Sequence, residues 1–437
     1  MYDLEKEIRE ERVKLEREIF YRKIAKLENQ FKQDMEIQGF RYVKTAERTV
    51  IFSFGEIRFS RKCYYKDGKY RYPLDEYLNL KRYERYSDVF LCHIAELAAA
   101  LPYRMVVKIV ERLMGIYITK DTVLKVVKLA NKLYENKIDY EYYQEENGES
   151  KKVEKLYIEA DGVMVKSKNN KQLRKDIAHV VIHEGTEIEY GKRKKLVNKH
   201  EIIAGSSRQA MEDTLLYIEK NYKVDRNTTF VTNSDMGAGY GFKFFSPIVK
   251  TFKAKHEHFW DKYHVQKEII RLSDFIESKL INRLKRSIEN HDRNELIVIL
   301  DTIESTIESD VLLEVFLSFK SRMLHNFKHT NPTQNRSITI DTVGVIESQH
   351  CKITNRMKKR KMYWTVLGAV TMAKMIVDNS TGNLESLFLG EWRKKYRKIQ
   401  EKYYGNVEWW KNEAKDSEIP TVKLYRTQQK GRKIIRF

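Results

Sequence analysis

The sequence is poor in cysteine and proline, and it contains no long apolar segment. Its three cysteines, Cys63, Cys92 and Cys351, include no Cys-x-x-Cys pair, so neither a disulfide framework nor a zinc knuckle is indicated. No apolar run approaches the roughly 20 residues that a membrane-spanning helix needs. The first residues are too highly charged for a signal peptide. We therefore expect a cytoplasmic protein with reduced thiols and no membrane partner.

Positive charge, in contrast, is abundant. The chain carries 83 Lys and Arg against 62 Asp and Glu, which gives a net charge of +21. A balance of this kind points to a polyanionic partner, with nucleic acid as the default candidate and an acidic membrane surface as the alternative. A hydrophobic content of 41% is sufficient for packed cores. The length of 437 residues predicts about two to four domains.

Changes of pattern along the chain predict seven regions. The first shows Leu4, Ile8, Leu15 and Ile19 at helix-like intervals, which indicates a charged helix that packs on the body of the protein or on a second subunit. The regions are an N-terminal helix (1–40), a small β meander (41–87), a helix-turn-helix-like region (88–150), the first part of an α/β core (151–260), a helical insertion (261–338), the second part of the core (339–400) and a basic tail (401–437).

The region 88–150 has the layout of a DNA-binding motif. A long helical pattern ends at Gly115, which is a good C-cap, and a second helix begins after Thr119. Two helices joined by a short glycine-containing turn are typical of a helix-turn-helix, although such hairpins are also common in other proteins. The second helix carries three lysines that we predict to contact DNA: Lys120, Lys125 and Lys128.

The texture after residue 151 is that of an α/β fold. Strands are predicted at 155–166, 176–185 and 195–207, followed by a helix at 208–222 and a strand at 228–235. Three adjacent strands, a helix and a fourth strand are the opening order of an RNase H-like fold. In that fold the first and fourth strands are neighbours, and the first is central.

Two aspartates lie on those two strands. Asp161 interrupts the apolar strand at 155–166, and Asp235 closes the strand at 228–235, which is 235 − 161 = 74 positions later. We expect the two to converge at one strand edge. In isolation, Asp161 could instead pair with Lys166, and Asp235 could cap the following helix.

A third acid would complete a site for divalent cations. Mg²⁺ prefers oxygen ligands, and a pair of such ions can act on both oxygens of a phosphodiester displacement. The best candidate is Glu347, on a predicted helix that continues into a basic run, and Asp341 is its rival. We expect two Mg²⁺ or Mn²⁺ ions at these acids. The basic run, which we expect to hold the DNA backbone, consists of Arg356, Lys358, Lys359, Arg360 and Lys361.

A fourth feature lies between the second and third acids. Asp261 and His264 are three positions apart at a helix start, so they share one face. The pair could be an N-cap aspartate beside a core histidine. Together with His256 and His258 it could also bind zinc, but those two residues lie on a strand.

With these residues identified, the sequence resembles the ISLre family of bacterial insertion-sequence transposases, an uncharacterised-protein-family type. The resemblance rests on "GEIRFSRKCYY", "YPLDEYLNL", "LYIEADGVMV", "NSDMGAGY", "HFWDKYHVQKEI" and "GVIESQHCKITNRMKKRKMYW", in this order. It implies a DDE transposase related to the Mutator-like group, with Asp161, Asp235 and Glu347 as the catalytic triad. It also implies a D-x-x-H signature at Asp261 and His264, and a helical insertion before the glutamate.

The sequence therefore predicts a transposase that binds the terminal inverted repeats of a mobile element as a homodimer or higher oligomer. Double-stranded DNA, both the inverted repeats and the target, is the expected partner. The enzyme would cut the element ends and join the resulting 3′-OH to the target strand. Two alternatives stay open: an RNase H-like nuclease or resolvase without strand transfer, and a non-enzymatic DNA-binding regulator.

Overall fold

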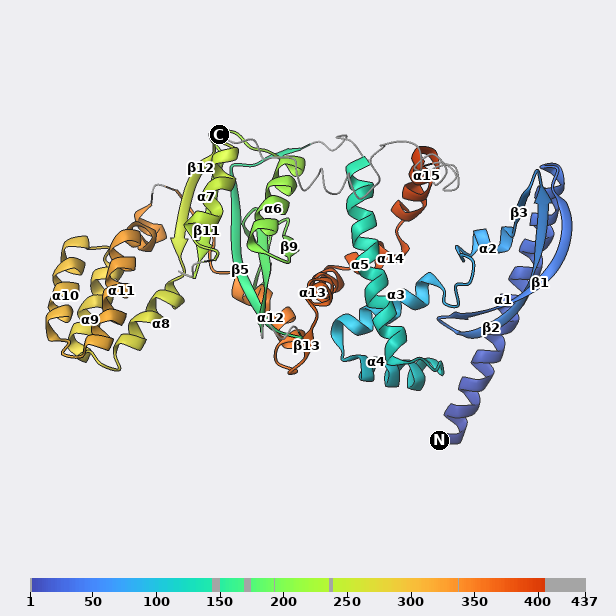
Figure 1. Cartoon of the computed structure of the whole chain (residues 1–437), viewed down its shortest axis with the longest axis horizontal. Coiled ribbons are helices and arrows are strands. Elements are labelled where there is room, and N and C mark those ends of the chain that lie inside the picture. Colours follow the sequence, from blue (N-terminus) through green and yellow to red (C-terminus); the bar gives the residue numbers. More distant parts are fainter. Residues whose placement is uncertain are drawn as a thin grey trace, which may run out of the picture.

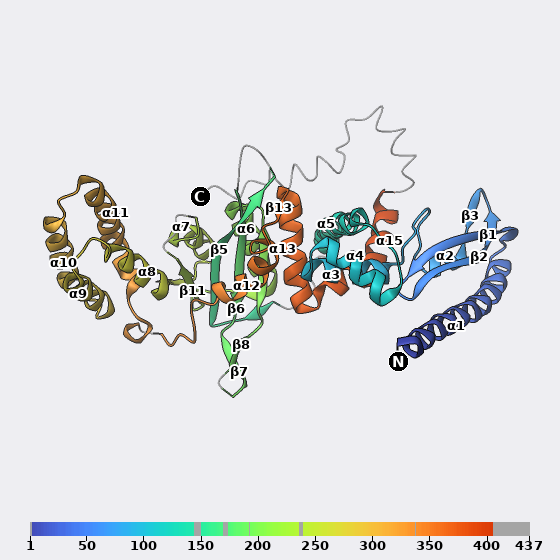
Figure 2. The ribbon, with the colours of Figure 1, turned by 90° about the horizontal axis from the view of Figure 1, so that it is seen from below.

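A computed structural model describes residues 2–143, 150–168, 174–191, 193–235, 239–336 and 338–404 of the chain. The molecule is a mixed α/β structure, elongated in Figures 1 and 2, with an N-terminal hairpin at one end and a bundle of helices at the other. The large sheet and a second group of helices lie between these ends. Among the described residues, no helix combines the length and apolarity required to cross a bilayer.

The N-terminal end consists of one long helix packed on a β meander. The predicted turn at Asp67 and Gly68 is present, and both residues have positive φ, 48° and 78°, as a tight hairpin turn requires. Ile24 of the helix lies in one apolar cluster with Val50 and Phe59 of the meander. The elements are α1 (Tyr2–Ile37), β1 (Arg41–Phe52), β2 (Gly55–Lys66), β3 (Lys69–Arg71) and α2 (Pro73–Tyr77).

The following helical region differs from the prediction in one respect. The pattern predicted one continuous helix up to Gly115, but Leu101 adopts an extended conformation and Pro102 starts a new helix. Proline lacks an N–H and disfavours helical geometry in the residue before it, so the break falls there. Gly115 is a left-handed C-cap with φ 67°, as predicted. The elements are α3 (Asp88–Ala100), α4 (Tyr103–Ile109), a π-helical turn (Val110–Met114) and α5 (Lys120–Tyr143).

The central sheet contains β5 (Lys155–Ser167) in its middle, as the sequence predicted. β5 pairs antiparallel with β6 (Arg174–His183) and parallel with β11 (Thr229–Ser234). β6 pairs antiparallel with β9 (His200–Ala204), and β11 pairs parallel with β12 (Lys255–Trp260). The strand order is therefore β12-β11-β5-β6-β9, and β13 (Tyr363–Trp364) adds to the end of β5.

The stretch at 195–207, predicted as one strand, is divided. Its first part is β8 (Arg193–Leu196), which forms a separate hairpin with β7 (Thr186–Tyr190), and its second part is β9. A minor pair of strands, β4 (Lys151–Lys152) and β10 (Tyr222–Lys223), lies outside the main sheet.

Helices cover both faces of the sheet. Alternate residues of β5 point to opposite faces, so Leu156, Ile158 and Ala160 pack in one cluster, beneath α6 (Ser207–Asn221) and α7 (Phe242–Thr251). Val163 and Val165 pack on the other face, where α12 (Ile346–Met357) and α13 (Val366–Thr381) lie.

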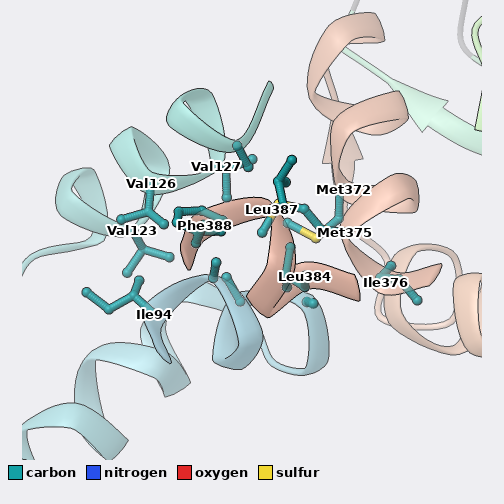
Figure 3. Packing of buried hydrophobic residues seen from close by; sticks show 14 of the residues in the cluster. Ile94, Val123, Val126, Val127, Met372, Met375, Ile376, Leu384, Leu387 and Phe388 are labelled. Carbon is teal, nitrogen blue, oxygen red and sulfur yellow. The ribbon is translucent and has the colours of Figure 1, made fainter. Parts of the chain in front are cut away.

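The second face and the helices of residues 88–143 form one continuous core. Figure 3 shows Ile94 of α3 and Val123 of α5 packed against Leu387 and Phe388 of α14 (Asn383–Leu389). Met372 and Met375 of α13 join the same cluster. The helix-turn-helix-like region is thus anchored to the sheet through α13 and α14, and α15 (Trp392–Tyr404) packs against α5.

Between β12 and α12 lies a bundle of helices with an apolar core of its own. Its helices are α8 (Lys262–Leu272), α9 (Ser278–Glu289), α10 (Arg293–Thr306) and α11 (Asp310–Asn326), followed by short 3₁₀ turns at Phe327–Thr330 and Thr333–Asn335. The bundle corresponds to the helical insertion predicted from the sequence. Most of the predicted basic tail, from residue 405 onward, lies outside the described residues.

Candidate active site

The two predicted aspartates lie on neighbouring parallel strands. In the register of β5 and β11, Asn233 is opposite Glu159. Continuing this register by two residues brings Asp235 level with Asp161, because both pairs are separated by 74 positions. Asp235 directly follows β11, and the next helix is capped by Gly241 without a side-chain bond, so Asp235 does not cap it.

The environment of Asp161 disfavours its charged form. Burial is the main cause that raises its pKa to about 6, and the neighbouring carboxylates of Asp235 and Asp176 add to the effect. The N–H of Gly162, which donates to Asp161 Oδ1 at 2.6 Å, and the nearby His264 act in the opposite direction. Clustered carboxylates with this property are a frequent feature of functional sites.

Asp261 and His264 lie beside this pair. The backbone N–H of Asp261 donates to Ser234 O at 2.8 Å, which places Asp261 next to the end of β11. The Asp261 side chain caps α8 by accepting the N–H of His264, and it also contacts His264 Nδ1; both distances are 3.0 Å. The N-cap interpretation is therefore correct, but the histidine is not a core residue, because its side chain is 22% exposed. Its other nitrogen lies 3.6 Å from Glu347 Oε1.

Glu347 lies on the first turn of α12, with a side chain 68% exposed. A second glutamate, which was not predicted from the sequence, holds this turn in place. Glu159, 1% exposed, accepts the N–H groups of Gly344 at 2.7 Å and Ile346 at 2.9 Å. Burial raises its pKa to about 7, and these backbone donors moderate the rise. Glu159 lies two residues before Asp161, on the same face of β5. This spacing was the sequence signal that could have identified it.

A histidine of α12, His350, contacts Asp161. His350 Nδ1 lies 3.5 Å from Asp161 Oδ2, and its ring stacks on that of His179 with centroids 4.9 Å apart. Burial lowers the pKa of His350 to about 3, so the ring is neutral at physiological pH. His350 was not predicted from the sequence either, although it follows Glu347 by one helical turn.

The contacts from Asp161 through His350 and His179 continue to Glu201 of β9. His179 Nε2 lies 2.9 Å from Glu201 Oε2, and the ammonium groups of Lys199 and Lys352 lie 2.8 and 2.5 Å from Oε1. Burial opposes ionisation of Glu201, but these partners together hold its pKa below the ordinary value. Lys352 belongs to α12, so Glu201 ties the helix to the sheet.

One of the residues predicted to contact DNA, Arg356, is buried. Arg356 is 3% exposed, and its guanidinium donates to the carbonyl groups of Ala98, at 2.9 and 3.2 Å, and Leu101, at 2.8 Å. It joins α12 to the end of α3, and the prediction for Arg356 is corrected accordingly. The rest of the basic run follows the end of α12 in an exposed turn: Lys358, Lys359, Arg360 and Lys361. Lys120, Lys125 and Lys128 are also exposed, on α5.

The rival to Glu347 lies elsewhere. The backbone N–H of Asp341 donates to the hydroxyl of Tyr157, and its Oδ2 lies 2.5 Å from the position that a Cβ on Gly185 would occupy. Tyr157 is four residues before Asp161 on β5. Asp341 therefore lies near the start of β5, and of the two acids it is Glu347 that adjoins His264.

The zinc alternative receives no support from the geometry. His256 Nε2 and His258 Nδ1 both contact the hydroxyl of Thr232, at 2.8 and 2.7 Å. Within the described part of the chain, no three acidic, histidine or cysteine side chains surround a common position suited to a metal ion.

The donors are nevertheless of the type that a hard cation prefers. Mg²⁺ in proteins is usually held by one or two carboxylates, with water and substrate phosphates completing its coordination. Asp161 and Asp235 offer such a pair on neighbouring strands, and burial together with the nearby carboxylate of Asp235 raises the pKa of Asp161. The donor set therefore fits a divalent cation.

Comparison with known proteins identifies related chains. The model of an uncharacterised protein family, UPF0236, matches residues 1–396. A UPF0236 protein in the vanSb 3′ region of Streptococcus gallolyticus is 30% identical over 387 residues, which are 87% of this chain and 84% of the relative. A UPF0236 protein of Caldanaerobacter subterraneus subsp. tengcongensis, whose name joins eleven designations, is 25% identical over 78% of this chain and 69% of its own.

Among solved structures, a chain of the Drosophila P element transposase strand transfer complex aligns with 76% of this chain and 84% of its own. The identity is 11% and the TM-score 0.25, a value too low to indicate a common fold.

Proposed function

Since the chain belongs to the uncharacterised protein family UPF0236, we propose that it is a DDE transposase of an insertion sequence, with an RNase H-like catalytic core. The observation that carries the proposal is the position of Asp161 and Asp235 at the same level of neighbouring strands, with the Asp261–His264 pair beside them and Glu347 next to His264. Asp161 comes from β5, Asp235 follows β11, and Glu347 from α12 contacts His264 beside them.

The strand order supports an RNase H-like core. Three neighbouring strands, β5, β6 and β9, form an antiparallel half, and β11 and β12 extend the sheet in parallel on the other side of β5. α6 connects the two halves, and the bundle α8–α11 separates β12 from the glutamate helix. The distance of 347 − 235 = 112 positions between the second and third acids is accounted for by that bundle.

Asp161, Asp235 and Glu347 are the residues that would hold two Mg²⁺ or Mn²⁺ ions. When bound, such ions lower the barrier for phosphodiester displacement by stabilising the attacking and leaving oxygens. Glu347 lies in the first turn of α12, and Glu159 holds this turn by accepting the N–H groups of Gly344 and Ile346. The Glu347 side chain itself is 68% exposed and lies beside His264.

His264 is suited to a positioning role. Its Nδ1 is paired with Asp261, so its Nε2 points toward Glu347 with a defined orientation. In that position it can orient the carboxylate or donate a hydrogen bond to the scissile phosphate. We assign no nucleophile to the protein, because water serves first and the 3′-OH of the DNA serves second.

In the first reaction, the oxygen of water bonds to the phosphorus at the element end, and the 3′ oxygen leaves with a proton. In the second, that 3′-OH attacks a phosphorus of the target strand and displaces the 3′ oxygen there. The exposed cations after α12 and along α5 would hold the DNA backbones.

The name of the Caldanaerobacter relative provides independent support. One protein sequence under eleven designations in one strain is typical of a gene present in several copies. Transposition is one process that multiplies a gene within a genome.

The test uses the DNA that flanks this reading frame and its short inverted repeats. Asp235→Asn should reduce Mg²⁺-dependent cleavage at least about a hundredfold, while DNA affinity stays within about twofold, since phosphate contacts dominate it. Asp274→Asn, an exposed aspartate in the turn after α8, is the matched control and should cleave normally. Cleavage by the Asp235 variant at the wild-type rate would disprove the assignment.

A second assay separates transposase from nuclease. Precut ends with a free 3′-OH should be joined to a target plasmid. A protein that hydrolyses DNA but never joins precut ends would be a nuclease or resolvase.

A further inference from the structure

Helix α1 has two separate apolar faces, whose centres lie about 140° apart around the helix axis. With 100° between successive residues, one face packs on the β1–β2 hairpin and the other points away from it. The packed face consists of Phe20, Ile24, Leu27 and Phe31. The second face consists of Leu4, Ile8, Leu15 and Ile19, which lie within an arc of about 60°. We call these four residues the α1 stripe.

The α1 stripe is exposed along its whole length. The exposed fractions are 59% for Leu4, 56% for Ile8, 54% for Leu15 and 40% for Ile19. The N-terminal half of α1 extends past the hairpin (Figure 1). The other face already anchors α1 to the hairpin, so the four exposed aliphatic residues are not required for that packing. Exposed apolar surface of this kind marks an interaction site.

The charges around the α1 stripe disfavour DNA as its partner. Residues 3–19 contain seven acidic and five basic side chains, so this segment is net negative in a chain of net charge +21. Phosphate backbones would be repelled. A surface with both signs of charge around an aliphatic centre is suited to another protein surface of the same type.

The central charges of the stripe indicate that this surface is a second copy of itself. Glu11 and Arg12 lie between Ile8 and Leu15 in the sequence, on opposite edges of the stripe, about 100° apart. When two stripes pack in parallel about a twofold axis, the left edge of one meets the right edge of the other. Each Glu11 then lies beside the Arg12 of the other copy.

We propose that the α1 stripe is a homodimer interface, in which two copies of α1 pack in parallel through these four residues. The stripe runs over 16 residues, from Leu4 to Ile19, so its ends are about 22 Å apart. An interface of that length is smaller than those of obligate dimers, and the association is therefore concentration-dependent. The inference goes beyond the proposed chemistry and does not depend on it.

Sedimentation at about 1 to 100 µM, a range that covers weak complexes, tests the proposal. The full chain should change from monomer to dimer as its concentration rises. Replacing Ile8 and Leu15 together by Glu should weaken the dimer at least about a hundredfold, because two charges would have to be buried in each copy. Val311→Glu, which places the same charge on an aliphatic residue 73% exposed in α11, should leave it unchanged.

Charge exchange tests the parallel arrangement. Glu11→Arg and Arg12→Glu should each dissociate the dimer, and the double exchange should restore it. A mixture of the two single variants should form a mixed dimer. The proposal would be overturned by a wild-type chain that is monomeric at every concentration, or by a dimer that persists when Ile8 and Leu15 are both replaced by Glu. It would also be overturned if neither single charge exchange lowered the sedimentation mass of the complex. DNA cleavage assays on the same variants report separately on the proposed function.

Discussion

The two sides of α12 carry similar charged residues, but the structure uses them differently. On the side facing the sheet, Lys352 and Arg356 bond to Glu201 and to the carbonyls at the end of α3. On the open side, Glu347 is 68% exposed, and the cations after Met357 face solvent. The comparison indicates that the buried charges determine where the helix lies and that the exposed ones are available for chemistry and DNA. Substitutions on the two sides should therefore separate activity from stability.

The largest expected effect is on the open side. Glu347→Gln should reduce cleavage about 100- to 1,000-fold, since it removes a charge that acts on the reacting phosphate. The thermal midpoint should change little, because the side chain is 68% exposed and its contact with His264 is a loose one at 3.6 Å. Cleavage and thermal unfolding of the same preparation measure both quantities. Equal loss of activity and stability would contradict the separation.

Glu201→Gln should have the opposite profile. Removing the negative partner of a buried ion cluster costs about 3 kcal/mol of unfolding free energy, the lower end for such pairs, since both lysines can still reach water. The folded-state pKa of Glu201 lies below its ordinary 4.5. Its contribution is therefore present above about pH 4.5 and is lost as the pH falls toward the folded pKa.

The difference in stability between the wild type and this variant should accordingly shrink below about pH 4.5. Urea unfolding at several pH values measures it. A difference that stays constant down to acid pH would show that Glu201 does not act through its charge.

Arg356→Met should destabilise the fold by about 2–3 kcal/mol, because it leaves buried carbonyl groups of α3 without a donor. Methionine keeps most of the side-chain volume. The salt dependence of DNA binding should not change, since a buried guanidinium releases no counterions. A flatter salt dependence would place Arg356 at the DNA after all.

The smallest effects are expected in the basic turn, one residue at a time. Replacing Lys358, Lys359, Arg360 or Lys361 by Gln should reduce the slope of log affinity against log salt by up to about 0.9 for each phosphate that the variant no longer neutralises. Thermal stability should not change. Binding titrations at several salt concentrations measure the slope, and slopes that stay unchanged in all four variants would remove this turn from the DNA-binding surface.

The parts of this structure that the sequence predicted are those governed by local pattern. Asp161 and Asp235 could be paired because each interrupts or ends an apolar strand, and the expected strand order made those two strands neighbours. The register of β5 and β11 places the two residues at the same level. The helical insertion and the cap at Gly115 were likewise visible in periodicity and glycine position. The break at Pro102 had a local signal that the apolar pattern obscured.

The buried contacts of α12 could not be predicted from a local pattern. Arg356 bonds to a carbonyl group 258 positions away, and Lys352 to a carboxylate 151 positions away. Nothing in the run "NRMKKRKMYW" distinguishes the buried cation from its exposed neighbours. His350 and Glu159 become important only when α12 lies across β5, which is a tertiary contact.

The most direct test of the central claim is the binding of Mn²⁺, followed by electron paramagnetic resonance of the free ion, with element-end DNA present. Wild type, Asp161→Asn, Asp235→Asn and Glu347→Gln would be titrated side by side. The account predicts that the wild type takes up the ion and that each substitution weakens uptake at least about tenfold. Uptake that is the same in all four proteins would contradict a shared cation site.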